Sequence, residues 1–246
     1  MSIEPTPDGS ATLWSERFCQ HFHNRNGALT QARHVFLQGT HTHLHSSPRV
    51  LEIGFGVGTS FLTTIADAAI RNVPLSYLAF EFDPQPAETL REIGNRHPAG
   101  GHPLWSGLLA RWPVRDKDAD RPCIRSASEL ASSSFMLSHE KILVEICFVD
   151  AVTARFPRSW ASAVYLDGFS PDVNPELWTP GFAACLADAM SPGSWLATYS
   201  VAGTVRRALA QAGLRVAKRP GVAGKRECLH AQRPDSAMKG DEGCAG

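Results

Sequence analysis

The chain has 246 residues, and its 24 Lys and Arg residues balance its 24 Asp and Glu residues. A hydrophobic content of 43% with 20% charged residues suits one large domain and excludes a disordered, fibrous or coiled-coil chain. The sequence has no apolar run of the roughly 18 residues that a membrane-spanning helix needs and no signal-peptide pattern, so we expect a cytoplasmic protein without a membrane span.

Short apolar runs alternate with helical patterns along the chain. The apolar runs predict strands at Arg49–Ile53, Leu75–Phe82, Lys141–Phe148, Ala161–Leu166 and Ser194–Tyr199. Apolar residues at helical spacing predict helices at Thr59–Arg71, from Pro84 to about Arg96, at Pro180–Met190 and at Val201–Ala212. Only a glycine-containing loop separates Leu214–Lys218 from Glu227–Ala231, which predicts an antiparallel hairpin.

This order of elements predicts an α/β fold. Alternating strands and helices favour a doubly wound, mostly parallel sheet with helices on both faces. A parallel sheet closed by an antiparallel C-terminal hairpin resembles the Rossmann-like class I methyltransferase pattern. We expect a single domain at residues 12–233 with flexible tails at 1–11 and 234–246, because the tails are rich in Pro, Gly, Ser and charge.

The cysteines and histidines do not predict a metal site. The six cysteines are scattered and include no Cys-x-x-Cys pair, which argues against a zinc cluster or a disulfide framework. On a strand, His41, His43 and His45 would align three imidazoles on one face, but no nearby acid or cysteine completes a metal-binding set. We therefore expect no bound metal.

A glycine-rich loop follows the first predicted parallel strand, where an open α/β sheet binds its ligand. Residues 52–58 read EIGFGVG, and the glycine or alanine that a dinucleotide-binding fingerprint needs further on is missing. The pattern resembles motif I of S-adenosylmethionine enzymes. This resemblance implies that Gly54, Gly56 and Gly58 admit the cofactor to the backbone and that Glu52 faces its ammonium group. The structural alternative for Glu52 is pairing with a neighbouring base.

Further acids follow the next strands. Glu81 ends the second strand, where an acid in nucleotide-binding sheets accepts hydrogen bonds from ribose, and Asp83 competes for this role. Asp150 ends the third strong strand and resembles the acid that meets the adenine amino group in such methyltransferases. For each of these acids, the structural alternative is a helix N-cap.

A more specific resemblance lies in residues 166–179, which read LDGFSP followed by NPELWT. These residues are similar to the LDGFAP-x-x-NP-x-x-W signature of the MnmC methyltransferase domain, which belongs to a family of tRNA wobble-uridine enzymes. Further agreement, including ARHVFL at 32–37 and GKRE at 224–227, extends it over roughly residues 13–232. The resemblance implies S-adenosyl-L-methionine as cofactor and methylation of the aminomethyl amine on a modified wobble uridine, with the tRNA anticodon stem-loop as partner.

The resemblance also implies roles for individual residues. Asp167 would be the base or orienting group for the acceptor, because only the neutral form of an amine carries a lone pair. The uracil ring would lie against Phe169, Pro171 and Trp178, and anticodon phosphates against Arg206, Lys225 and Arg226. The structural alternatives are a turn-forming carboxylate at Asp167, a core position for Trp178 and a solvated face for the basic residues.

The chain also departs from the family pattern. No part of its length corresponds to the FAD-dependent oxidase domain that often accompanies this methyltransferase, which predicts a stand-alone enzyme. Family residues are replaced at Gln20, His21, His23, Gln31, Thr40, Phe82, Val149 and Val173. Two alternatives therefore stay open: a methyltransferase of the same fold with another amine acceptor, and a catalytically silent RNA-binding relative. The oligomeric state, the set of tRNAs and thiolation of the uridine also stay open.

Overall fold

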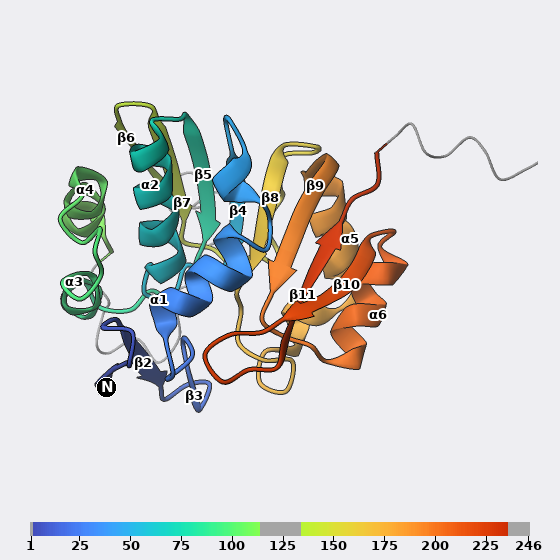
Figure 1. Ribbon diagram of the computed structural model, residues 1–246, viewed down its shortest axis with the longest axis horizontal. Helices are drawn as coiled ribbons and strands as arrows, with labels where there is room; N and C mark the ends of the chain where they lie inside the picture. The colour runs from blue at the N-terminus through green and yellow to red at the C-terminus, as the bar shows by residue number, and fades with distance from the viewer. Residues whose placement is uncertain (1, 114–133, 236–246) are drawn as a thin grey trace, which may run out of the picture.

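The computed structural model describes residues 2–113 and 134–235. Its centre is an eight-stranded sheet with the strand order β10-β11-β9-β8-β4-β5-β7-β6 (Figure 1). In chain order these strands are β4 (Arg49–Ile53), β5 (Leu75–Phe80), β6 (Ser134–His139), β7 (Ile142–Cys147), β8 (Ala161–Leu166), β9 (Met190–Thr198), β10 (Arg215–Pro220) and β11 (Glu227–Gln232).

The middle of the sheet is parallel and both of its edges are antiparallel. Strand β4 pairs in parallel with β5 and β8, and these pair in parallel with β7 and β9. Strand β6 pairs antiparallel with β7, while β10 and β11 form the expected hairpin beside β9. The predicted doubly wound α/β sheet with an antiparallel C-terminal hairpin is therefore confirmed.

Helices cover both faces of the sheet. The helices are α1 (Ala28–Gln31), continued by the π-helix η1 (Ala32–Leu37), then α2 (Thr59–Arg71), α3 (Ala87–Gly94), α4 (Pro103–Arg111), α5 (Pro180–Ala189) and α6 (Gly203–Gln211), with short 3-10 helices η2 (Thr42–Leu44) and η4 (Pro175–Trp178). The predicted helix at 59–71 is confirmed at both ends. The next helix begins at Ala87 with Pro86 as its N-cap, so Pro84 lies before the helix and not in its first turn.

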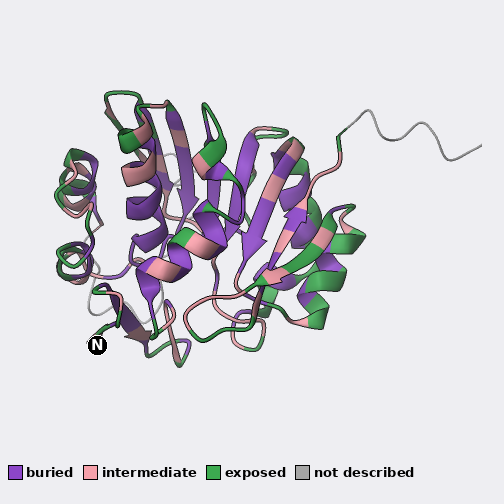
Figure 2. Ribbon diagram, in the orientation of Figure 1, coloured by how far each residue is buried: buried purple, intermediate pink, exposed green. Residues whose placement is uncertain are grey.

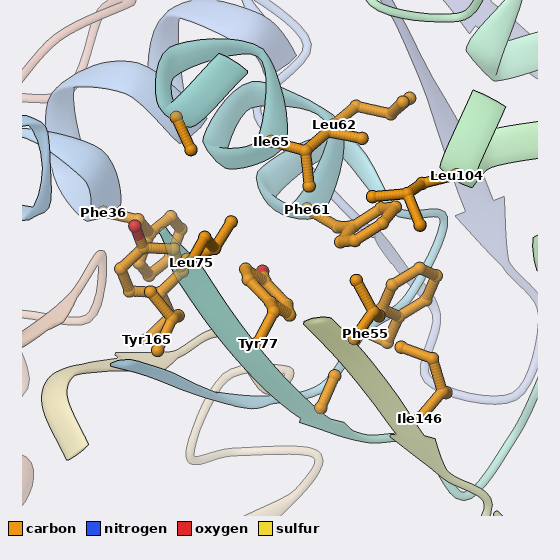
Figure 3. Close-up of a cluster of buried hydrophobic side chains, with 14 of the residues drawn as sticks. Phe36, Phe55, Phe61, Leu62, Ile65, Leu75, Tyr77, Leu104, Ile146 and Tyr165 are labelled. Atoms are coloured by element: carbon orange, nitrogen blue, oxygen red, sulfur yellow. The ribbon is translucent and has the colours of Figure 1, made fainter. Parts of the chain in front are cut away.

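The central strands β4, β5 and β8 are buried along most of their length (Figure 2). Alternation along them sends side chains into two large clusters, one on each face of the sheet. Tyr77 and Tyr165 pack with Phe61 of α2 on one face, as the close-up in Figure 3 shows. Leu78 follows Tyr77 on β5, and Val164 precedes Tyr165 on β8. Both point to the other face of the sheet and belong to the cluster that α5 and α6 cover. Burial of both faces explains why these strands have near-continuous apolar sequences.

The N-terminal segment corrects one expectation. Strands β1 (Ile3–Pro5), β2 (Ala11–Ser15) and β3 (Gln20–His21) form a small antiparallel sheet, so residues 2–11 are not a loose tail. Asp8 accepts hydrogen bonds from Thr6, Ser10 and Thr30, and these bonds hold its pKa below the usual range although partial burial opposes this. The predicted C-terminal tail lies outside the described residues from 236 onward.

The histidine triplet does not lie on a strand. Residues 42–44 form the 3-10 helix η2, and His41 before it has a left-handed backbone with φ of 58°. The His41 ring packs edge-on against Trp195 at 5.0 Å, and His43 Nδ1 lies 3.3 Å from the Leu37 carbonyl oxygen. The imidazoles therefore do not share one face. Within residues 2–113 and 134–235, no cluster of three or more His, Cys, Asp or Glu residues is arranged to hold a metal, and no helix could span a membrane.

Candidate active site

A cavity of about 380 Å³ lies at the carboxyl ends of β4, β5 and β8. Its volume falls within the roughly 300–1,000 Å³ typical of small-molecule sites. It is lined by the glycine loop after β4, by the loops after β5, β7 and β8, and by three residues of the N-terminal segment. The position is the one that an open α/β sheet uses for ligands.

The backbone of the glycine loop lies against the loop that follows β8. Gly54 has a φ of 87°, and a Cβ there would lie 2.7 Å from the Asp167 carbonyl oxygen. Gly58 has a φ of 81°, and a Cβ there would lie 2.7 Å from the Trp105 ring. Gly54 and Gly56 line the cavity, whereas Gly58 caps α2 behind it. A side chain at Gly54 would thus force apart two loops that shape the cavity, whereas one at Gly58 would displace Trp105 behind it.

Glu81 joins the glycine loop to the end of β5. Its Oε2 accepts a hydrogen bond from the Gly56 backbone N–H at 2.7 Å, and its Oε1 accepts one from the Asp83 N–H at 2.6 Å. Burial raises the pKa of Glu81 to about 7, although the two backbone hydrogen bonds act in the opposite direction. Glu81, Asp83 and Asp150 all line the cavity. Asp150 Oδ1 also accepts the Val152 N–H at 3.0 Å, so it caps a turn and faces the cavity at once.

Glu52 does not line the cavity. It shares a sheet face with Val50, and its Oε2 accepts a hydrogen bond from the Tyr77 hydroxyl at 2.8 Å within the core. Burial and the nearby Asp167 raise its pKa well above the usual value. The expected contact of Glu52 with the cofactor ammonium is therefore wrong in this geometry: side chains alternate along β4, and this one points under α2. The alternative of a base as its partner is also wrong, since the partner is a tyrosine.

Asp167 follows β8 and lines the cavity with a side chain that is only 4% exposed. Burial raises its pKa well above the usual value. Its Oδ2 lies 3.5 Å from the Ser60 hydroxyl and 3.7 Å from His23 Nε2. Its Oδ1 has no hydrogen-bond partner among the described residues. A buried carboxylate with one unpartnered oxygen fits a group that takes or orients a proton of a ligand.

Of the three residues expected to contact the uracil ring, only Phe169 lines the cavity. Phe169 lines the cavity, but its ring stacks on Phe18 at 4.2 Å and meets the edge of Phe22 at 5.0 Å. Trp178 does not line the cavity: it packs in the core and donates its indole N–H to the Phe169 carbonyl at 2.9 Å. Pro171 is also absent from the lining. Pro171 and Trp178 therefore do not wall this cavity, and the core alternative for Trp178 is confirmed.

The N-terminal segment supplies residues that the sequence analysis missed. Arg17, Phe18 and Phe22 line the cavity, and Gln20 Nε2 donates to the Ser170 hydroxyl at 2.6 Å. The Arg17 guanidinium lies 4.8 Å from the centre of the Phe82 ring. The signal in the sequence that could have indicated them is the pair of aromatic residues Phe18 and Phe22 on either side of position 20. Of the replaced family residues, Phe82, Val149 and Val173 line this cavity, whereas Gln31 and Thr40 do not.

The expected phosphate-binding residues do not line the cavity. Lys225 is exposed in the β10–β11 loop and lies 5.1 Å from the centre of the Tyr199 ring. The Tyr199 hydroxyl donates to the Gly168 carbonyl at 2.8 Å, next to Asp167. Arg226 is exposed in the same loop, and Arg206 is exposed in the first turn of α6. These three cations are therefore solvent-facing, and Lys225 is connected to the loop that carries Asp167.

Charge in the cavity is strongly unequal. The acids that line it are Glu81, Asp83, Asp150, Asp167 and Glu176, whereas Arg17 is the one Lys or Arg in the described lining. Since burial penalises ionised carboxylates, a positively charged ligand would relieve this penalty. The cavity therefore suits a cationic ligand, such as a sulfonium or an ammonium.

Comparisons with known proteins agree with this geometry. A family described as S-adenosyl-L-methionine-dependent methyltransferase matches residues 123–234. The tRNA 5-methylaminomethyl-2-thiouridine biosynthesis bifunctional protein MnmC of Aromatoleum aromaticum is 35% identical over 256 residues, which is 96% of this chain and 36% of that protein. MnmC of Paracidovorax citrulli is 37% identical over 241 residues, covering 94% of this chain and 35% of its own length.

The chain belongs to the S-adenosyl-L-methionine-dependent methyltransferases. It spans about a third of the length of the MnmC proteins that it matches. The crystal structure of MnmC2 from Aquifex aeolicus shares the fold, with a TM-score of 0.70 and 21% identity over 97% of this chain and 72% of that one. The cofactor of this family is S-adenosyl-L-methionine, and the open glycine loop beside a cavity rich in acids fits it.

Proposed function

We propose that this enzyme transfers the methyl group of S-adenosyl-L-methionine to the primary amine of an aminomethyl group on a modified wobble uridine of tRNA, forming 5-methylaminomethyl-(2-thio)uridine. The observation that carries the proposal is the buried Asp167 carboxylate, whose Oδ1 has no partner in the described structure, in a cavity next to the glycine loop. The similarity to MnmC over nearly the whole chain supports this acceptor. A tRNA acceptor also implies that the enzyme works in the cytoplasm.

Binding of the cofactor is assigned to the residues at the ends of β4, β5 and β7. Gly54 and Gly56 offer backbone without side chains, while Glu81 and Asp150 offer carboxylate oxygens for hydroxyl and amino groups. Gly58 acts indirectly, since it lets α2 begin against Trp105. When bound, the cofactor supplies an electrophilic methyl group on a positively charged sulfur.

The protein has to hold a neutral amine in line with that methyl group. An alkylammonium has a pKa near that of lysine, about 10.4, so most of the acceptor is protonated at neutral pH. Asp167 Oδ1 takes or orients the ammonium proton, which leaves the lone pair on nitrogen. Phe169 and Phe22 border the acceptor side and exclude water. Holding the reactants in line can supply about 7–11 kcal/mol of the barrier reduction.

Docking of the anticodon stem-loop is assigned to the C-terminal hairpin. Lys225 and Arg226 are exposed in its loop, and Arg206 is exposed where α6 begins after β9. The hydrogen bond from Tyr199 to Gly168 ties this side of the molecule to the Asp167 loop. Phosphates held there would bring a splayed-out wobble base to the cavity, which is how proteins commonly read single-stranded RNA.

The test measures methyl incorporation from labelled S-adenosyl-L-methionine into tRNA that carries aminomethyl-uridine. Wild type should methylate this tRNA and not the same tRNA without the aminomethyl group. Asp167→Asn should lose most of the activity while it keeps cofactor affinity, measured by calorimetry. Wild type that binds the cofactor but leaves this tRNA unmethylated would favour another amine acceptor. Wild type that binds tRNA but no cofactor would favour a silent RNA-binding relative.

A further inference from the structure

His23 contacts Asp167 from outside the cavity. It does not line the cavity, its side chain is 4% exposed, and its Nε2 lies 3.7 Å from Asp167 Oδ2. Strand β2 fixes its backbone, because the His23 N–H donates to the Thr12 hydroxyl at 2.9 Å and that hydroxyl donates to the His23 carbonyl at 3.1 Å. Thr12 is fully buried. The imidazole is thus held in place against the carboxylate by the N-terminal sheet.

The two Asp167 oxygens have different surroundings. Burial lowers the pKa of His23 to about 4, so the ring is neutral near pH 7 and carries one N–H. His23 Nδ1 has no partner in the described structure, which favours the proton on Nε2, facing Asp167. The Ser60 hydroxyl faces the same oxygen, Oδ2, at 3.5 Å. Two donors therefore face Oδ2, whereas Oδ1 is buried and has no partner among the described residues.

We propose that His23 is a positioning residue: its Nε2–H, together with the Ser60 hydroxyl, holds Asp167 Oδ2 so that Oδ1 meets the nitrogen of the acceptor amine. The distance of 3.7 Å is longer than a hydrogen bond, and such contacts commonly tighten when the ligands bind. The ammonium proton passes to Oδ1, and its bonding pair stays on nitrogen. This inference rests on the proposed function, because it requires an amine acceptor.

The other groups that face Asp167 do not replace His23. Glu52 lies close to it on β4, and burial raises the pKa of Glu52 well above its usual value. The Tyr77 phenol from β5 and the Tyr199 phenol after β9 are also close enough for Asp167 to raise their pKa values, although burial is the larger cause for both. The Tyr77 hydroxyl donates to Glu52 and the Tyr199 hydroxyl donates to the Gly168 carbonyl, so neither donates to Asp167. His23 and Ser60 are accordingly the groups whose N–H and O–H face Asp167 Oδ2.

The experiment compares wild type with His23→Leu and His23→Gln across pH 6–9.5, using kcat and KM on tRNA bearing aminomethyl-uridine. Loss of the donor should move the acid limb of kcat up by about one pH unit, a tenfold loss on its steep part, with KM for the cofactor unchanged. The Gln side chain should restore the profile because its amide can donate to Oδ2. His21→Gln is the matched control, since His21 lies outside the cavity lining and pairs with Glu4 at 3.1 Å.

A second readout needs no acceptor. In protein with bound S-adenosylhomocysteine, the carboxyl carbon of Asp167 is titrated by NMR, and His23→Leu should raise its pKa by about one unit. His23→Asn, which is polar but too short to reach Oδ2, should do the same and covers the case in which Leu prevents folding. An unchanged Asp167 titration in folded variants would overturn the inference, as would Gln behaving like Leu. Inactive wild type would refute only the proposed function.

Discussion

Glu81 makes the stability of the protein depend on pH in a direction that can be measured. Burial raises its pKa from 4.5 to about 7, and the side chain is 5% exposed. The folded state therefore holds this proton more tightly than the unfolded state does. The stabilisation is fully present below pH 4.5 and is lost as pH rises through about 7. At about 1.36 kcal/mol per unit, the total is about 3.4 kcal/mol, of which about 2.5 kcal/mol falls between pH 5 and 8.

Glu81→Gln should remove this dependence at the cost of one hydrogen bond. Both carboxylate oxygens accept backbone N–H groups, and an amide can accept only one of them, which costs about 1–3 kcal/mol at every pH. The variant should thus be less stable than wild type at pH 5 and regain about 2.5 kcal/mol relative to it by pH 8. Urea unfolding at four pH values measures this difference.

Glu92→Gln is the control for the substitution itself, because Glu92 is an exposed acid on α3. A difference between wild type and Glu81→Gln that stays within about 0.5 kcal/mol from pH 5 to 8 would refute the reasoning. Such a result would mean that the two backbone hydrogen bonds compensate for burial, and that Glu81 enters the cofactor site already ionised.

Three further predictions concern other parts of the molecule. Asp8→Ala should lower the free energy of unfolding at pH 7 by about 1–3 kcal/mol. Because the folded pKa of Asp8 is depressed, this difference from wild type should begin to narrow as pH falls below 3.8 and vanish only below the folded pKa, and urea unfolding at pH 7 and 3 measures the narrowing. Trp178→Phe should lose about 1 kcal/mol with its hydrogen bond to Phe169 while cofactor affinity, measured by calorimetry, is kept. Lys225→Ala with Arg226→Ala should weaken tRNA binding and flatten its salt dependence by up to about 0.7–0.9 in log–log slope per lost phosphate contact, measured by filter binding; an unchanged slope would contradict the phosphate role.

The parallel core could be predicted because burial on both faces leaves a simple signal in the sequence. Strands β4, β5 and β8 are nearly continuous apolar runs, so their order and their carboxyl ends could be placed. Strand β6 was missed because it pairs only with β7 and is mostly exposed or half-buried, which leaves no clear pattern. The β1–β3 sheet was missed because its turns carry the Pro, Gly and Asp residues that otherwise indicate a loose tail.

The sequence was enough to place the site at one edge of the sheet, but it was not enough to predict which side chains reach the cavity. Motif resemblance put Glu52 and Trp178 in the site, and both are core residues in the structure. The reason is geometric: sequence position gives the end of a strand, whereas entry to the cavity depends on which face each side chain takes. Asp167 does line the cavity, because it lies one residue beyond β8, where the chain leaves the sheet.

The missed N-terminal sheet changes how the acceptor side of the site is understood. Phe18 and Phe22 pack on Phe169, Gln20 bonds Ser170, and His23 faces Asp167, so one short segment contacts the loop after β8 at several points. The glycine loop and Glu81 belong to the main sheet and would bind the cofactor in any methyltransferase of this shape. Because most of these contacts of residues 18–23 are with the loop after β8, substitutions there should alter acceptor choice before they alter cofactor affinity.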